Sequence, residues 1–216
     1  MTIIKHPAQR VAVFIDAQNL YHSAKHLYGS KVNFGKLVED AVAGRPLVRA
    51  TAYVISTEEG TEQTFFEALS KVGIEAKTKD LQIFAGGAKK GDWDVGIVMD
   101  AVALAPKLDA VIIVSGDGDY VPLVEYLQIK EGCQVEAVSF GRSSSAKLIE
   151  AVDHFTDLDE DPGKYLLGFR GRPMAESGNT QRANNRNTSS GRQPNAGRAP
   201  SAQRQNNVRR VERKVD

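Results

Sequence analysis

The chain has 216 residues, of which 41% are hydrophobic, and its formal net charge is +1. This length suits one well-buried domain of ordinary size, and we expect no second full domain. A single cysteine excludes an internal disulfide framework and a zinc site built from several cysteines.

Apolar runs and helical patterns alternate along the first two thirds of the chain. In chain order they predict a strand at 11–16, a helix at 17–28, a strand at 47–56, a helix at 62–73, a strand at 74–79, a helix at 92–105, a strand at 110–115, a helix at 120–132 and a strand at 134–140. Strands that alternate with helices form a parallel sheet covered on both faces. We therefore predict an α/β, Rossmann-like fold with three layers and a central, mainly parallel β-sheet.

The composition changes sharply toward the C-terminus. Residues 170–216 carry eleven Lys or Arg and three Asp or Glu, a local charge of +8, which leaves −7 on the rest of the chain. We predict an N-terminal extension at 1–9, a folded domain at 10–160 and a disordered Arg-, Asn- and Gln-rich tail at 161–216. The tail is either a solubilising extension or an arm for single-stranded nucleic acid. We favour the arm, because guanidinium groups pair with phosphates and stack on bases.

No apolar stretch approaches the roughly 18 residues that suggest a membrane span, and the N-terminus lacks the apolar region of a secretory signal. We expect a cytoplasmic protein that does not contact a membrane. The sequence does not determine the oligomeric state, and a homodimer stays open.

Acidic residues follow two of the predicted strands. Asp16 ends the first strand, Asp117 and Asp119 follow the strand at 110–115, and Asp94 lies near the start of the helix before it. The carboxyl ends of parallel strands meet at one edge of a sheet, where ligands gather, so we expect these carboxylates to converge. Clustered carboxylates repel one another unless a cation neutralises them, and oxygen ligands favour Mg²⁺ or Mn²⁺. Asp119 could instead be only a helix N-cap, but this alternative does not explain the other three.

Several neighbours of these acids have candidate roles of their own. Lys90, just before the acidic helix, could hold a phosphate, and Ser115 could bond a carboxylate or cap the turn. We expect Asn19, Lys90 and Ser115 to contact the substrate. Asp100 lies about 9 Å along the helix from Asp94 and about 120° around it, so the two can scarcely bind one ion. We interpret Asp100 as structural or as a support for a metal ligand, and direct metal ligation by Asp100 is the less favoured alternative. For Trp93, stacking on a base and packing in the core are equally open.

Three segments resemble the motifs of NYN-domain proteins, most closely the LabA-like branch of this PIN-like nuclease superfamily. They are "FIDAQNLY" at 14–21, "KKGDWDVGIVMDA" at 89–101 and "VSGDGDYVPLVEYL" at 114–127, and the resemblance covers roughly residues 10–158. It implies a PIN-like fold and catalytic, metal-binding carboxylates at Asp16, Asp94 and Asp117, completed by Asp119. Asn19 would then orient Asp16 or a metal-bound water. The sequence departs from the family pattern at Trp93, where a small aliphatic residue is commoner, and at Tyr120, where phenylalanine is.

These features favour a metal-dependent endoribonuclease that hydrolyses the phosphodiester bonds of single-stranded RNA. The alternative is a non-catalytic RNA-binding regulatory protein of the LabA-like family. A phosphatase that works through a phosphorylated aspartate fits less well, because such enzymes usually carry a second aspartate two residues on, where this chain has Gln18. The number of metal ions and the target RNA do not follow from the sequence.

Overall fold

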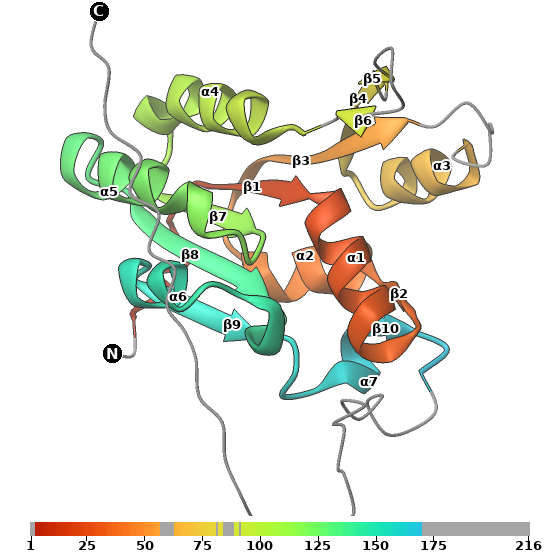
Figure 1. The fold of residues 1–216 in the computed structure, drawn as a ribbon. Helices are drawn as coiled ribbons and strands as arrows, with labels where there is room; N and C mark the ends of the chain where they lie inside the picture. The colour runs from red at the N-terminus through yellow and green to blue at the C-terminus, as the bar shows by residue number, and fades with distance from the viewer. Residues whose placement is uncertain (1–2, 57–62, 81, 84–88, 91, 170–216) are drawn as a thin grey trace, which may run out of the picture. The chain divides into compact units, whose positions relative to one another are not determined.

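Six parallel strands form the central sheet of the computed structural model, which describes residues 3–56, 63–80, 82–83, 89–90 and 92–169 (Figure 1). Their order across the sheet is β4-β3-β1-β7-β8-β9, and every neighbouring pair is parallel. The strands are β1 (Val11–Asp16), β3 (Leu47–Ser56), β4 (Glu75–Asp80), β7 (Ala110–Val114), β8 (Gln134–Ser139) and β9 (His154–Asp157). The prediction of a mainly parallel sheet is confirmed.

Helices cover both faces of this sheet (Figure 1). One face carries α1 (Ala17–Tyr28), α2 (Phe34–Val42) and α3 (Gln63–Lys71), and the other carries α4 (Asp94–Leu104), α5 (Val121–Lys130) and α6 (Ala146–Ala151). Side chains alternate along β1, so that Val11, Val13 and Ile15 join the first core. Ala12 and Phe14 join the second. The three predicted layers are therefore present.

Short elements connect and extend these layers. They are the 3₁₀ helices η1 (Ala105–Lys107), η2 (Gly118–Tyr120) and η3 (Gly141–Ser143), the helix α7 (Pro162–Tyr165), and the strands β2 (Lys31–Val32), β5 (Gln82–Ile83), β6 (Lys89–Lys90) and β10 (Leu166–Leu167). β2 pairs with β10, and β5 pairs with β6, both antiparallel. In the parts of the chain that the structure describes, no helix is long and apolar enough to span a bilayer.

The folded body extends further toward the C-terminus than predicted. The side chain of Asp161 caps α7 by accepting a hydrogen bond from the backbone N–H of Lys164. Tyr165 and Leu166 are buried in the core beneath α1 and α2. A disordered tail beginning at residue 161 is therefore wrong for residues 161–169, because these side chains bury apolar surface that local composition does not reveal. The remainder of the predicted tail, 170–216, lies outside the described residues.

A charged pair lies inside the domain and joins α2 to β8. The side chains of Arg45 and Glu136 are each 1% exposed, and Arg45 Nη1 lies 2.5 Å from Glu136 Oε1. Lys5 Nζ adds a second ion pair with Glu136 at 3.0 Å. Arg45 also donates to the carbonyl oxygens of Ala41 and Val42, at the end of α2. The guanidinium thus satisfies helix carbonyls and a buried carboxylate together.

Candidate metal centre

The acidic residues predicted from the sequence lie at three neighbouring points of the fold. Asp16 is the last residue of β1, Asp94 is the first residue of α4, and Asp117 and Asp119 lie in the turn between β7 and α5. β1 and β7 are adjacent and parallel in the sheet. Their carboxyl ends therefore open at the same edge, as ligand sites in such sheets require.

Three of these carboxylates come together. One oxygen from each of Asp94, Asp117 and Asp119 lies within 4.8 Å of the others. Asp16 is outside this group, although the nearby charges of Asp94 and Asp117 contribute to raising its pKa. The structure thus assembles three candidate ligands with a fourth carboxylate beside them, and direct metal ligation by Asp16 stays a prediction.

Burial and mutual repulsion raise the pKa of two of the acids. For Asp94, burial raises the pKa most and neighbouring carboxylates raise it further, against a hydrogen bond from Tyr120 that lowers it. Burial likewise raises the pKa of Asp16, while the N–H of Asn19 opposes it and nearby carboxylates add to it. Among the ion pairs of the described residues, none involves the acids of this centre. A cation bound between them would relieve this repulsion.

Asn19 links the first strand to the acidic turn. Its backbone N–H donates to Asp16 Oδ1 at 2.9 Å, which makes Asp16 the N-cap of α1. Its side-chain Oδ1 accepts from the N–H of Gly116 at 3.0 Å. Asn19 therefore orients Asp16 through its backbone and holds the turn after β7 through its side chain.

Ser115 and Asp117 shape the same turn from within. Ser115 Oγ accepts from the N–H of Asp117 at 3.2 Å, and Asp117 Oδ1 accepts from the N–H of Asp119 at 3.0 Å. Ser115 therefore positions an acidic residue in the structure, and its predicted contact with substrate stays a prediction. Asp117, rather than Asp119, is the capping residue of η2.

The two glycines of the turn allow a close approach to the loop after β8. A Cβ atom at Gly116 would lie 2.6 Å from Ser144 Oγ and 2.9 Å from Ser139 Oγ, and one at Gly118 would lie 2.7 Å from Ser145 Oγ. The N–H of Ser145 donates to the carbonyl of Gly116 at 2.8 Å. A Cβ atom at Gly116 would also lie 3.0 Å from the backbone Cα of Ser144, so a side chain there would force the turn or this loop to shift.

Comparison with known proteins identifies the family. Residues 10–159 match the family model of the NYN domain. The chain belongs to the NYN-domain family. The low amplitude and bright protein LabA of Synechococcus elongatus is 28% identical to this NYN chain over 160 residues, 70% of this chain and 84% of LabA. The resemblance seen in the sequence motifs is confirmed.

A solved structure supports the same assignment. The crystal structure of a protein of unknown function from Vibrio parahaemolyticus matches this NYN chain with a TM-score of 0.69 and 33% sequence identity. The match covers 76% of this chain and 100% of that protein's chain. Fold and sequence similarity therefore extend over about three quarters of this chain.

Asp100 belongs to a different group of side chains in the NYN domain. Its Oδ2 accepts from Tyr53 OH at 2.6 Å and from Lys77 Nζ at 2.5 Å. Burial alone would raise the pKa of Asp100, but these two hydrogen bonds outweigh it and lower the pKa. Asp100 therefore joins α4 to β3 and β4, as the structural interpretation of its place on the helix expects.

Trp93 packs within the NYN domain beside the acidic centre. Its Nε1–H donates to the carbonyl of Val54 at 3.0 Å, and its ring meets Tyr53 edge-on with centroids 5.4 Å apart. The ring is half-buried against the core beneath α4. Of the two interpretations of Trp93, these contacts favour core packing.

Gly96→Ala should destabilise the NYN domain because the added Cβ would lie 2.5 Å from Trp93 Cε3. Replacing a helical glycine with alanine gains about 1 kcal/mol of helix propensity. Overpacking typically costs about 1–3 kcal/mol. Because the bond to Val54 anchors the ring, we expect this cost to exceed the gain and leave a net loss of up to about 2 kcal/mol. Urea unfolding gives the loss, and the emission of Trp93, the chain's one tryptophan, reports movement of the ring.

Gly35→Ala in α2 is the matched control for this prediction. A Cβ there would lie 3.1 Å from Cγ1 of Val72, a half-exposed side chain that can shift. We expect this variant to be neutral or slightly stabilised. A Gly96→Ala protein that is more stable and has unchanged emission would contradict the packing described for Trp93.

Two residues near the centre complete the comparison with the sequence analysis. The sequence patterns do not single out Asp92, although its charge raises the pKa of Asp94. Its position two residues before Asp94, in the same acidic motif, could have indicated it.

The backbone of Lys90 lies in β6 beside Gln82 of β5, and its side chain is outside the described part of the structure. A phosphate contact by Lys90 therefore stays a prediction.

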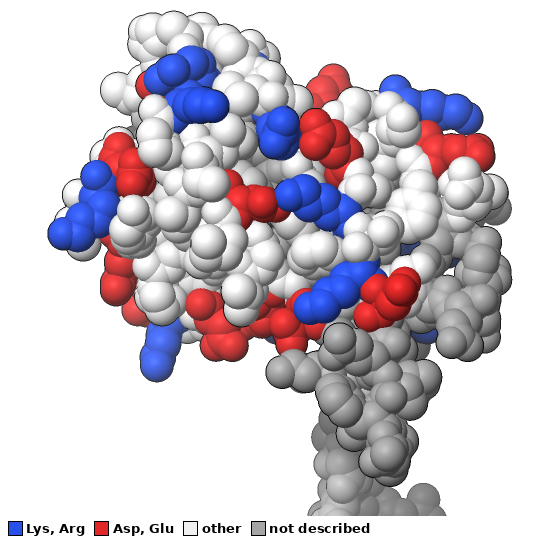
Figure 2. Space-filling model, turned by 90° about the horizontal axis from the view of Figure 1, so that it is seen from above, with Lys and Arg blue, Asp and Glu red and all other residues white. Residues whose placement is uncertain are grey.

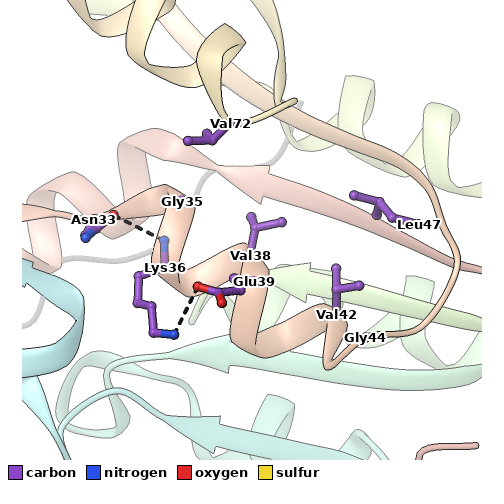
Figure 3. A pocket seen from close by; sticks show the side chains of 9 residues that line it. All are labelled: Asn33, Gly35, Lys36, Val38, Glu39, Val42, Gly44, Leu47 and Val72. Atoms are coloured by element: carbon purple, nitrogen blue, oxygen red, sulfur yellow. Dashed lines mark hydrogen bonds and ion pairs between the residues drawn. The ribbon is translucent and has the colours of Figure 1, made fainter. Parts of the chain in front are cut away.

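A cavity of about 650 Å³ lies elsewhere in the NYN domain, against α2 and the start of β3 (Figure 3). Its lining residues are Asn33, Gly35, Lys36, Val38, Glu39, Val42, Gly44, Leu47 and Val72. None of the acids of the candidate metal centre lines it. Two of the lining residues, Lys36 and Glu39, form an ion pair at 3.0 Å (Figure 3). The open cavity and the acidic centre are therefore separate features of the NYN domain.

Proposed function

We propose that this NYN protein is a metal-dependent endoribonuclease that hydrolyses the phosphodiester bonds of single-stranded RNA. The observation that carries the proposal is the convergence of Asp94, Asp117 and Asp119, whose oxygens lie within 4.8 Å of one another. NYN domains are a PIN-like nuclease family, and PIN-like nuclease domains usually use divalent metals. The centre thus has the chemistry that its family would use.

The donor set fits Mg²⁺ or Mn²⁺. All of the candidate ligand atoms are carboxylate oxygens, which these hard cations prefer. None of the Lys or Arg residues whose side chains the structure describes forms an ion pair with these acids. A bound cation would neutralise their charge. When bound, the metal would activate a water and neutralise charge on the leaving oxygen.

The protein's own residues would hold and orient the ligands. Tyr120 is buried, and its pKa is raised, so its hydroxyl stays protonated and donates to Asp94 Oδ1 at 3.1 Å. Asn19 fixes the acidic turn relative to Asp16, which would complete the ligand set. These bonds favour one arrangement of the carboxylates before substrate arrives.

Cleavage of a labelled circular single-stranded RNA by the purified full chain tests the proposal. A circle has no ends, so linear products can arise only from an endonuclease. We expect linear products with Mn²⁺ or Mg²⁺ and none with a chelator. An intact circle under all metal conditions would overturn the proposal.

A non-catalytic RNA-binding regulator is the second candidate. The observation that favours it is the position of Asp16 outside the group of three carboxylates, which leaves the four-carboxylate set incomplete. Binding of the circular RNA in Mn²⁺ without cleavage would support this candidate over the nuclease.

Deleting residues 170–216 should weaken RNA binding and make it less sensitive to salt. This segment has a charge of +8, and each phosphate neutralised on a single strand contributes about −0.7 to the slope of log affinity against log salt. If half of its basic residues contact phosphate, the slope should become shallower by about 3–4 units. Fluorescence anisotropy over a salt series measures this, with the Asp94→Asn variant used throughout to prevent cleavage.

The control replaces the arginines of residues 170–216 with glutamine, which keeps the length and removes the charge. It should behave like the deletion. Equal affinity and equal salt slope in all three proteins would identify the tail as a solubilising extension.

A further inference from the structure

An apolar surface covers the outer sides of α4 and α5. The two helices lie side by side on the same face of the sheet (Figure 1). On α4 the exposed side chains recur every four residues, at Val95, Met99 and Ala103. On α5 the exposed apolar side chains are Pro122, Tyr126 and Ile129. We call these six residues the α4–α5 surface.

The exposure of this surface is large for side chains of this kind. Val95 is 73% exposed, Met99 62% and Ile129 75%. Apart from Asp94 and Asp100, α4 consists of apolar residues and glycine. A helix that is apolar on all sides is typical of a buried position, yet the part of the chain that the structure describes leaves the outer side of α4 uncovered. Such surfaces mark interaction sites.

The charges around the α4–α5 surface indicate what covers it. Both signs occur at its edge, where the bordering charged residues are Asp94, Asp100, Lys107, Glu125, Lys130 and Glu131. Figure 2, which views the molecule from the side of α4, shows a largely uncharged surface with basic and acidic side chains interspersed. A nucleic-acid site would need cations on the surface itself, and a membrane site would need a predominantly basic margin. Mixed charges are instead suited to a two-fold interface between two copies of this chain. In such an interface the edge of one copy faces the same edge of the other, so basic residues of one can lie opposite acidic residues of the other.

We propose that the α4–α5 surface binds a second copy of this chain, forming a two-fold symmetric dimer. The four-residue spacing on α4 forms a ridge of the kind that packs into the groove of a facing helix. Ala103 permits close approach at one end of this ridge. Val95 directly follows Asp94, so the interface would border the candidate metal centre of each copy. The proposal does not rest on the nuclease activity, since the surface is independent of the acidic residues.

Sedimentation velocity of the full chain over about two orders of magnitude in concentration tests the dimer. We expect a dimer whose association is maintained or strengthened at high salt, because apolar burial is not screened. Met99→Glu and Ile129→Glu, each placed twice in a symmetric interface, should each weaken association at least about 100-fold. Both positions are exposed in the single chain, so circular dichroism and the melting temperature should show an intact fold.

The matched control is Val72→Glu. Val72 is 51% exposed and follows α3, on the other face of the sheet, so this variant should dimerise like the parent. A parent that remains monomeric at all concentrations would overturn the proposal, as would two glutamate variants that dimerise normally. Association that disappears at high salt would also overturn it, because it would assign the contact to the basic tail and the acidic body.

Discussion

Asp94→Asn should lower metal-dependent RNA cleavage by more than about 100-fold, because even partners outside a ligand set typically contribute 10- to 100-fold. The substitution removes one of the three carboxylates whose oxygens lie within 4.8 Å of one another. Asparagine can still accept the hydrogen bond from Tyr120, so the local packing is kept. Initial rates of cleavage at saturating Mn²⁺ measure the loss.

The same substitution should leave the metal-free protein as stable as the parent or more stable. The pKa of Asp94 is raised from 3.8 in the folded state, chiefly by burial. The folded protein therefore holds this proton more strongly than the unfolded chain, and ionisation of Asp94 lowers stability as the pH rises through the raised value. Below pH 3.8 the variant and the parent should be equally stable. The extra stability of the variant should grow as the pH rises from 3.8 to the raised pKa of Asp94, and should then stay constant. Urea unfolding of both proteins over a pH series gives the difference.

Metal binding supplies a readout that does not depend on RNA. A ligand at 100 times its dissociation constant stabilises a protein by about 2.7 kcal/mol, so Mn²⁺ should raise the melting temperature of the parent and not that of Asp94→Asn. Asp109→Asn, at the opposite end of β7, is the matched control and should keep both cleavage and the metal effect. A large loss of metal-free stability in Asp94→Asn would instead indicate a structural role for this carboxylate.

Glu136→Gln should destabilise the domain by about 3–5 kcal/mol, the usual result of breaking a buried ion pair by removing one partner. The side chain of Arg45, which is 1% exposed, would keep its charge without its carboxylate. Burial alone would raise the pKa of Glu136, but hydrogen bonds from Arg45 and Lys5 outweigh it and lower the pKa. The pair therefore stabilises the fold above the ordinary value of 4.5, and this contribution is lost as the pH falls through the lowered value. Urea unfolding of parent and variant at neutral pH tests the magnitude.

Two further variants separate charge from packing at this pair. Glu39→Gln likewise removes a glutamate carboxylate, but from an exposed ion pair with Lys36. It should change the free energy of unfolding by less than about 1 kcal/mol. The double variant Arg45→Met with Glu136→Leu should recover much of the loss, because neither charge is then buried alone. A Glu136→Gln protein as stable as the parent would show that the pair contributes little beyond its shape.

Local patterns in the sequence predict the strands that are apolar and the helices that flank them. They miss β9, whose segment "HFTD" contains one large apolar residue, and α2, although Asn33 is a suitable N-cap for it. The same patterns do not predict β10 and α7, because the residues that these elements contact are distant in the chain. For example, Leu166 of β10 pairs with Val32 of β2. Such contacts depend on the assembled fold rather than on any short window of sequence.

The acidic centre was predictable because strand ends carry aspartates and parallel strands share an edge. The sequence could not provide the distances between the aspartate carboxylates. Asp16 caps α1 and lies outside the group formed by Asp94, Asp117 and Asp119. The role of Gly116 also required the structure, since the close approach of Ser144 involves a loop from another part of the chain.

The two bonds of Gly116 have a consequence for how the protein is made. Its N–H is held by Asn19, from the first helix, and its carbonyl is held by Ser145, near the end of the domain. A growing chain emerges from its N-terminus at about 5–20 residues per second, so Ser145 becomes available only after all four aspartates have been synthesised. A partly made chain therefore carries the acidic residues without the contact that fixes their turn. The order of synthesis therefore makes this contact of the acidic turn available only after most of the domain has been made.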